Sequence, residues 1–90
     1  MFIKTVKIEI ETALKIYNKH FVLSEEIENI ITKKETIFKK VGGNQYLAIG
    51  IENRYLTIFF RCNNKTKEAT ITTAYPSSRK QIKFYKNKTG

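Results

Sequence analysis

Four runs of β-branched and aromatic residues dominate the second half of the chain, and short turns separate each run from the next. Such residues favour extended backbone, so each run is expected to form a strand. Gly42-Gly43, between the first two runs, suits a tight hairpin because glycine adopts positive φ without steric cost. Connections this short join antiparallel neighbours. The predicted strands are residues 35–41, 45–51, 54–62 and 68–75.

The third predicted strand has two chemically different sides, because alternate side chains of a strand point to opposite faces of its sheet. We expect its apolar side to meet helices, and this side consists of Leu56, Ile58 and Phe60. The other side carries aromatic, hydroxyl and guanidinium groups from Tyr55, Thr57, Phe59 and Arg61. The sheet is therefore expected to have one face covered by helices and one face partly open.

The beginning of the chain predicts a strand followed by a helix. Residues 2–10 alternate with period two, as in a strand with Val6, Ile8 and Ile10 facing inward. Residues 11–19 then have a helical composition.

A second helix is expected to begin at Ser24, whose hydroxyl would cap a free N–H while Glu25 and Glu26 oppose the helix dipole. It is expected to end near Lys33. Its buried stripe would consist of Ile27, Ile30 and Ile31.

The end of the chain predicts a third helix. Pro76 ends the last strand, because proline has no N–H for a sheet. Ser78 and Gln81 have the three-residue spacing of a capping box, which would open a short basic helix over residues 79–87. The predicted fold is α+β: an N-terminal strand and two helices, then a four-stranded antiparallel meander and the C-terminal helix. We expect residues 1–90 to form a single domain.

The charge is distributed very unevenly along the chain. Residues 1–53 contain eight Lys or Arg and seven Glu, whereas residues 54–90 contain nine Lys or Arg and one Glu. Nearly all of the net charge of +9 therefore lies in the last strands and the terminal helix. Concentrated positive charge with aromatic and hydroxyl side chains between the bases indicates a nucleic-acid binder.

The composition argues against several other classes. The sequence has no aspartate, and seven of its eight glutamates precede Arg54, so the basic half lacks the clustered carboxylates that hold Mg²⁺ in nucleases. Cys62 is the only cysteine, which excludes an internal disulfide, and we expect it to be buried as a small hydrophobe. No apolar run reaches the roughly 20 residues of a membrane span, and the N-terminus has no secretory layout. A cytoplasmic protein without metal or cofactor is expected.

Several short motifs resemble the small endoribonuclease toxins, namely the RelE-like and BrnT-like toxins of the barnase–EndoU–colicin–RelE grouping. His20 ends the first predicted helix, and Arg79 and Tyr85 have the spacing of an Arg and a Tyr in the terminal helix of BrnT-like chains. The sequence motifs that carry the resemblance are Leu23-Ser24-Glu25-Glu26-Ile27, Arg54-Tyr55-Leu56-Thr57-Ile58 and Thr73-Ala74-Tyr75-Pro76. The resemblance covers about residues 20–86.

The resemblance implies metal-free RNA cleavage, in which the 2′-OH is the nucleophile and the enzyme supplies a base, an acid and cations. Arg61 and Arg79 are candidate phosphate clamps, since guanidinium binds phosphate in a bidentate manner. His20, the one histidine, is a candidate base, although a histidine here also suits packing. Thr73 could bond a phosphate oxygen, and Tyr75 could stack on a base or donate a proton.

Further residues are candidates for RNA binding without chemistry. They are Arg54, Tyr55, Phe59, Thr72, Lys80, Lys83 and Tyr85. Arg54 also fits a turn residue or sheet-edge charge, and Tyr85 also fits packing of the last helix onto the sheet.

The sequence thus predicts an endoribonuclease toxin that acts on RNA, including ribosome-bound mRNA or tRNA, and is held inactive by an acidic antitoxin. The alternative is a non-catalytic basic module, either a ParE-like inhibitor of a protein target or a small viral or plasmid RNA-binding protein.

Overall fold

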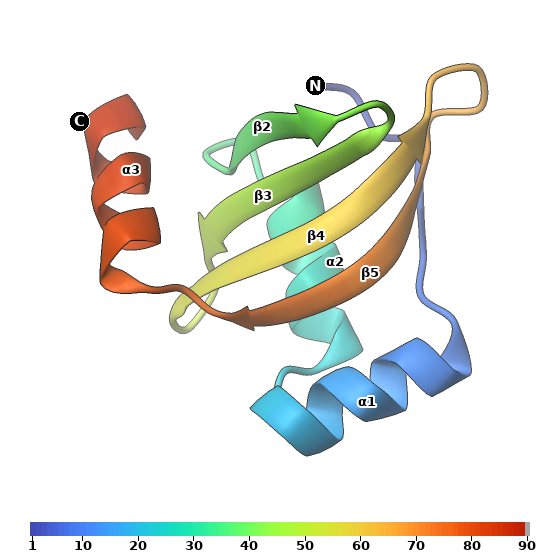
Figure 1. Ribbon diagram of the computed structural model, residues 1–90, viewed down its shortest axis with the longest axis horizontal. Coiled ribbons are helices and arrows are strands. Elements are labelled where there is room, and N and C mark those ends of the chain that lie inside the picture. Colours follow the sequence, from blue (N-terminus) through green and yellow to red (C-terminus); the bar gives the residue numbers. More distant parts are fainter. Residues whose placement is uncertain (90) are drawn as a thin grey trace.

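The computed structural model describes residues 1–89, which form one five-stranded sheet and three helices. The helices are α1 (Ile10–His20), α2 (Ser24–Thr32) and α3 (Arg79–Thr89). The strands are β1 (Thr5–Lys7), β2 (Ile37–Gly42), β3 (Gln45–Ile51), β4 (Tyr55–Asn63) and β5 (Glu68–Pro76). Their order across the sheet is β1-β5-β4-β3-β2 (Figure 1).

The predicted α+β fold and its antiparallel meander are confirmed. Strands β2, β3, β4 and β5 pair in sequence order, each antiparallel to the next. Gly43 has φ of 55° at the β2–β3 hairpin, a conformation that glycine adopts without strain. The capping box is also present: Ser78 N–H donates to Gln81 Oε1 at 2.8 Å, and Gln81 N–H donates to Ser78 Oγ at 3.2 Å.

The N-terminal strand is shorter than predicted and belongs to the same sheet. β1 pairs in parallel with the start of β5, where Val6 lies opposite Ala69. The inward position predicted for Ile10 is wrong, because this residue begins α1 and is 79% exposed. Alternation with period two cannot distinguish the end of a strand from the first residue of a helix, which explains the error.

The core lies between α2 and one face of the sheet. The predicted helix stripe of Ile27, Ile30 and Ile31 is buried. The side of β4 that was expected to meet the helices is buried as well. Core residues from β4 and β5 include Leu56, Ile58, Phe60, Cys62, Ala69, Ile71 and Ala74. Burial of apolar surface of this extent is the main favourable contribution to folding.

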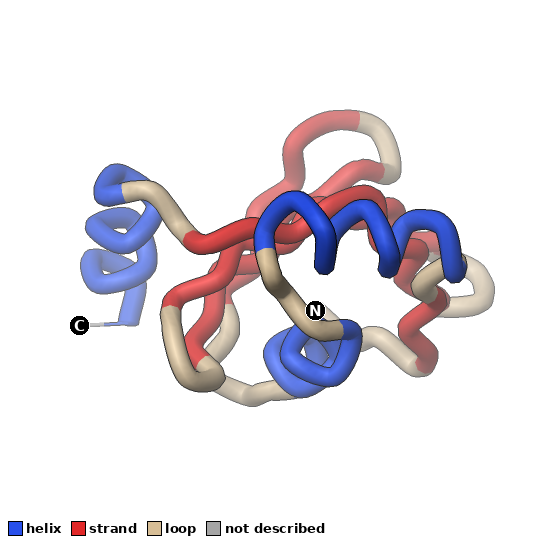
Figure 2. Tube along the Cα trace, turned by 90° about the horizontal axis from the view of Figure 1, so that it is seen from below, coloured by secondary structure: helices blue, strands red, loops and turns tan. Residues whose placement is uncertain are grey.

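The helices are distributed over both faces and one edge of the sheet. Figure 1 shows α2 behind the sheet, α1 alongside β5, and α3 at the far end near β2 and β3. Figure 2 shows the same arrangement from below, with α2 and α3 well separated. Tyr85 of α3 packs on Tyr55, which lies on the side of β4 opposite Leu56. The second face is thus covered at one end by α3 and open beyond it.

The start of α2 differs from the prediction in one detail. The N-cap is Leu23, without a side-chain cap hydrogen bond, and Ser24 is the first helical residue. Glu26 instead accepts a hydrogen bond from the Leu23 N–H at 3.0 Å. The long glutamate side chain therefore satisfies a free backbone donor, which the serine hydroxyl was expected to do.

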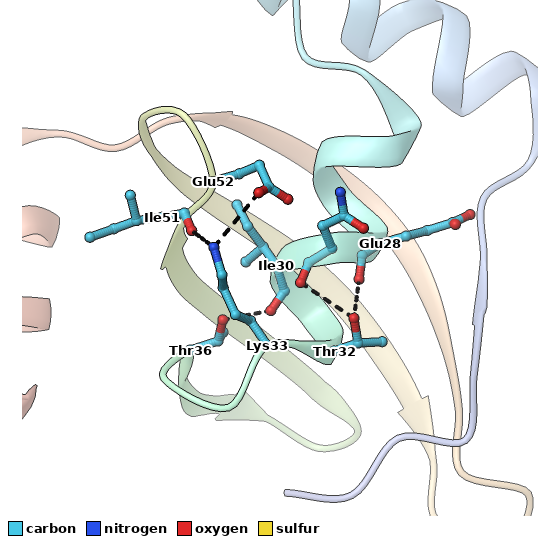
Figure 3. A network of polar contacts seen from close by, with 8 residues as sticks. Glu28, Ile30, Thr32, Lys33, Thr36, Ile51 and Glu52 are labelled. Atoms are coloured by element: carbon cyan, nitrogen blue, oxygen red, sulfur yellow. Dashed lines mark hydrogen bonds and ion pairs between the residues drawn. The ribbon is translucent and has the colours of Figure 1, made fainter.

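The end of α2 is fixed to the neighbouring β-turns by a set of polar contacts (Figure 3). Thr36 Oγ1 donates to the Ile30 carbonyl at 2.5 Å, and Lys33 Nζ donates to the Ile51 carbonyl at 2.6 Å. Lys33 Nζ also lies 3.7 Å from a Glu52 carboxylate oxygen. Gly50 of β3 permits this close approach, because a Cβ there would lie 2.7 Å from both Ile30 Cγ2 and Thr36 Oγ1.

Candidate functional site

The open face of the sheet is built from alternate residues of β4 and β5. Phe59 lies opposite Thr73, and Thr57 lies opposite Tyr75. The register shifts after Phe59, so that Phe60 lies opposite Ile71 and Thr72 is an extra residue in β5. A bulge of this kind re-aims side chains and is frequent beside functional sites. Here it leaves Thr72 exposed next to Thr73.

An aromatic cluster surrounds Tyr75 on this face. The Tyr75 ring stacks on Phe59 with centroids 6.1 Å apart, and the His20 ring lies 5.8 Å from it. His20 is half-buried at the last position of α1, which packs along β5. The structure therefore brings together His20, Phe59, Thr73 and Tyr75 from three different elements.

The hydroxyl of Tyr75 is oriented by Gln81. The Ser78 N–H can only donate, and it lies 2.8 Å from Gln81 Oε1, which fixes that atom as the oxygen of the amide. Thr57 Oγ1 donates to the same oxygen at 3.0 Å. The Gln81 amide nitrogen therefore donates to the Tyr75 hydroxyl at 2.9 Å. Because the tyrosine oxygen accepts this bond, its own proton is free to be donated elsewhere.

Two adjoining depressions run from His20 along the edge of β5. The first, of about 250 Å³, is lined by Thr12, Lys15, Ile16, Lys19, His20, Thr72 and Thr73. The second, of about 270 Å³, is lined by Glu9, Thr12, Gln45, Arg61, Thr70, Ile71 and Thr72. They share Thr12 and Thr72, so together they form one groove, which we call the β5 groove. Its cationic side chains are Lys15, Lys19 and Arg61.

Arg61 lies at the end of this groove away from His20 and is also distant from Tyr75. Arg61 pairs with Thr70, whereas Tyr75 pairs with Thr57, four positions earlier in β4. At the usual rise of a strand this corresponds to about 13 Å along β4. Arg61 is exposed and also borders a larger depression of about 610 Å³ at the β4–β5 turn. Arg61 therefore shares the β5 groove with His20 and Thr73 but does not join Tyr75 in one compact cluster.

The bases of α3 lie beside the open face. Arg79 is the first residue of α3, directly after the capping serine, and Lys80 and Lys83 follow it, all three exposed. Lys80 borders a shallow apolar hollow together with Phe84 and Leu47. These bases stand on the same helix as Gln81, which contacts Tyr75.

Two predicted RNA-binding residues serve the fold. Arg54 donates to the Phe21 carbonyl at 2.6 Å and pairs with Glu26 at 3.1 Å, which ties β4 to the segment between α1 and α2. Tyr85 is only 7% exposed and packs edge-on against Tyr55. Burial, together with the nearby Glu35 charge, raises the pKa of Tyr85, so its hydroxyl stays protonated near neutral pH. Its ring is not presented for stacking on a base.

Gln81, Lys15 and Lys19 were not identified as site residues from the sequence. The sequence indicates Gln81 only as part of a capping box. Its hydrogen bond to the Tyr75 hydroxyl depends on how α3 packs on the sheet. The two lysines had a detectable signal: with Thr12 they share one side of the predicted first helix at three- and four-residue spacing. Nothing in the sequence, however, placed that side against β5.

Within residues 1–89, no group of three or more His, Cys, Asp or Glu side chains is arranged to hold a metal ion. In the same part of the chain, no helix has the length and apolar character needed to cross a membrane.

Comparison with solved structures shows a similar fold in a ribonuclease toxin. The chain matches the toxin BrnT of Brucella abortus with a TM-score of 0.67 and 11% sequence identity, over 83% of this chain and 97% of BrnT. Neither a protein-family model nor a curated protein matches the sequence. The predicted resemblance to BrnT-like toxins is thus confirmed at the level of the fold.

Proposed function

We propose that this chain is an endoribonuclease that cleaves RNA through the RNA's own 2′-OH, and that it is the toxin of a toxin–antitoxin pair. The observation that supports this most directly is the Gln81-oriented Tyr75 hydroxyl beside His20, on a fold shared with the ribonuclease toxin BrnT.

The proposed reaction assigns one proton transfer to each of two side chains. His20 accepts the proton of the 2′-OH, and the 2′-oxygen forms a bond to the adjacent phosphorus. The bond from phosphorus to the 5′-oxygen breaks, and the Tyr75 hydroxyl gives its proton to that oxygen. The products are a 2′,3′-cyclic phosphate and a 5′-hydroxyl end. We assign Thr73, which lines the β5 groove together with His20, a hydrogen bond to a phosphate oxygen. Arg79, four residues after Tyr75, is assigned to clamp the phosphate.

The β5 groove supports RNA as the substrate. Lys15, Lys19 and Arg61 line it with positive charge for phosphates, and Phe59 of the neighbouring aromatic cluster offers a ring for stacking on a base. The site lacks clustered carboxylates, which fits chemistry that needs no metal ion. The strongly basic half of the chain also suits an acidic antitoxin, which would compete with RNA for the same charges.

The position of Arg61 favours a second candidate, the non-catalytic RNA-binding module. A guanidinium about 13 Å along the strand from Tyr75 suits a contact with a neighbouring phosphate better than with the reacting one. In this alternative the groove binds RNA and no bond is broken.

Cleavage of total RNA in the presence of EDTA distinguishes the two candidates. We expect discrete fragments with 5′-hydroxyl ends, and we expect Tyr75→Phe to lower the rate by about two to four orders of magnitude, the usual range for losing a positioned acid. Tyr46→Phe is the matched control, because Tyr46 stacks on Phe60 on the opposite face of the sheet. Intact RNA that is nevertheless bound would favour the binding module, and 5′-phosphate ends would exclude the 2′-OH mechanism.

A further inference from the structure

Helix α1 carries an apolar stripe that no part of residues 1–89 covers. Ile10, Leu14, Tyr17 and Phe21 are 79%, 56%, 46% and 69% exposed. Their spacing of four, three and four residues places them on one side of the helix. Ile16, on the side that faces the core, is only 3% exposed. Contiguous exposed apolar surface of this kind marks an interaction site on a folded protein.

The backbone holds one end of this stripe in a specific and unfavourable conformation. Phe21 has φ of 56°, a left-handed conformation that bulky residues rarely adopt. Its N–H donates to the Tyr17 carbonyl at 2.8 Å, and its own carbonyl accepts from Arg54. Its ring packs edge-on against Tyr17 with centroids 6.1 Å apart. The fold therefore presents Phe21 outward on a fixed support, as expected for a functional position.

The charges around the stripe decide which partner fits it. Lys15 and Lys19 line the β5 groove on another side of α1, and the side chains beside the stripe include Ala13 and Asn18. Residues 1–53 have almost balanced charge, whereas residues 54–90 carry nearly all of the +9. An acidic partner would be attracted to the basic half, not to this stripe. A second copy of the chain can meet the stripe while α3 and the β4–β5 turn, which carry most of the cations of the basic half, stay far from the contact (Figure 1).

We propose that α1 is a self-association surface through which two copies of this chain pack stripe against stripe. In an antiparallel arrangement about a two-fold axis, Ile10 of one copy meets Phe21 of the other, and Leu14 meets Tyr17. Four side chains form a smaller surface than the roughly 800 Å² per partner of a standard interface, so we expect a reversible dimer. The β5 groove stays open in this dimer, because Lys15 and Lys19 lie on another side of the helix.

Sedimentation equilibrium of the full chain over a concentration series tests this proposal without RNA. We expect the mass to rise from 10.5 kDa toward twice that value as the concentration increases to about 100 µM. Leu14→Glu should weaken the association by at least tenfold, because it buries a charge at the centre of the interface. Asn87→Glu, which adds the same charge to exposed α3 far from the stripe, should leave it unchanged.

Circular dichroism of both variants checks that the fold is retained, and Tyr17→Ser provides a second, uncharged test of the stripe. A wild-type chain that remains monomeric over the whole series would overturn the proposal. A dimer that forms equally well with Leu14→Glu and Tyr17→Ser would also overturn it, since association would then use another surface. Either result leaves the proposed RNA cleavage untouched, because the inference does not rest on it.

Discussion

At the scale of single residues, Glu26 is a buried carboxylate that connects three parts of the chain. Its Oε1 accepts from the Leu23 N–H at 3.0 Å and lies 3.1 Å from the Arg54 guanidinium, which also binds the Phe21 carbonyl. Burial alone would raise the pKa of Glu26, but the Leu23 hydrogen bond and Arg54 outweigh it and hold this pKa below its ordinary value of 4.5. The charged form is therefore favoured in the folded state.

We expect Glu26→Gln to destabilise the protein in a pH-dependent way. A group whose pKa is lowered on folding contributes stability above its unfolded pKa and loses it as the pH falls through the folded pKa. The variant should be less stable by about 1.5–3 kcal/mol at pH 7, the range for a hydrogen bond to a charged group. In urea unfolding, the difference in stability between the variant and the wild type should shrink below pH 4.5, the ordinary pKa of a glutamate. Glu25→Gln, at an exposed neighbouring position, is the control, and a difference that stays constant with pH would contradict this account.

At the scale of secondary-structure elements, the close approach of α2 to β3 depends on Gly50. A Cβ at this position would lie 2.7 Å from Ile30 Cγ2 and from Thr36 Oγ1, and Thr36 is itself bonded to the Ile30 carbonyl. We expect Gly50→Ala to cost about 1–3 kcal/mol of unfolding free energy, as for other overpacked cores. Gly42→Ala is the matched control, because nothing lies within 4 Å of its added Cβ. Equal stability of the two variants in urea unfolding would show that α2 can shift freely.

The elements that could be predicted from the sequence are those determined by local chemistry. Ser78 and Gln81 form their capping box within one helical turn, and Gly43 provides the positive φ of the β2–β3 hairpin turn. The parallel pairing of Val6 with Ala69 joins residues far apart in the chain, and no local pattern specifies it. The same limit applies to the candidate site. His20 and Tyr75 were each identified by residue type, but their contact depends on where α1 packs along β5.

At the scale of the whole molecule, the fold converts an asymmetry along the sequence into an asymmetry in space. The basic residues 54–89 form β4, β5 and α3, which surround the open face and one side of the β5 groove. The nearly neutral residues 1–53 supply α2, which covers the other face, and the apolar stripe of α1. If both proposals hold, RNA binding and self-association use separate parts of the surface.

The last prediction tests whether the position of the charges matters more than their number. Lys19→Ala with Arg61→Ala removes two charges from the β5 groove, whereas Lys34→Ala with Lys40→Ala removes two from exposed positions near α2 and the β2 edge. Binding to single-stranded RNA should be measured between about 50 and 200 mM salt, where each phosphate contact contributes about 0.7 to the slope of log affinity against log salt. The groove variant should lower that slope by about one to two units and weaken binding by tenfold or more, because both cations line the groove that we propose to bind the RNA backbone. The α2-side variant should change both quantities little, since charges separated from the RNA by more than about 10 Å are screened. Equal effects of the two variants would mean that RNA binding reflects net charge alone, and the β5 groove would then have no special part in it.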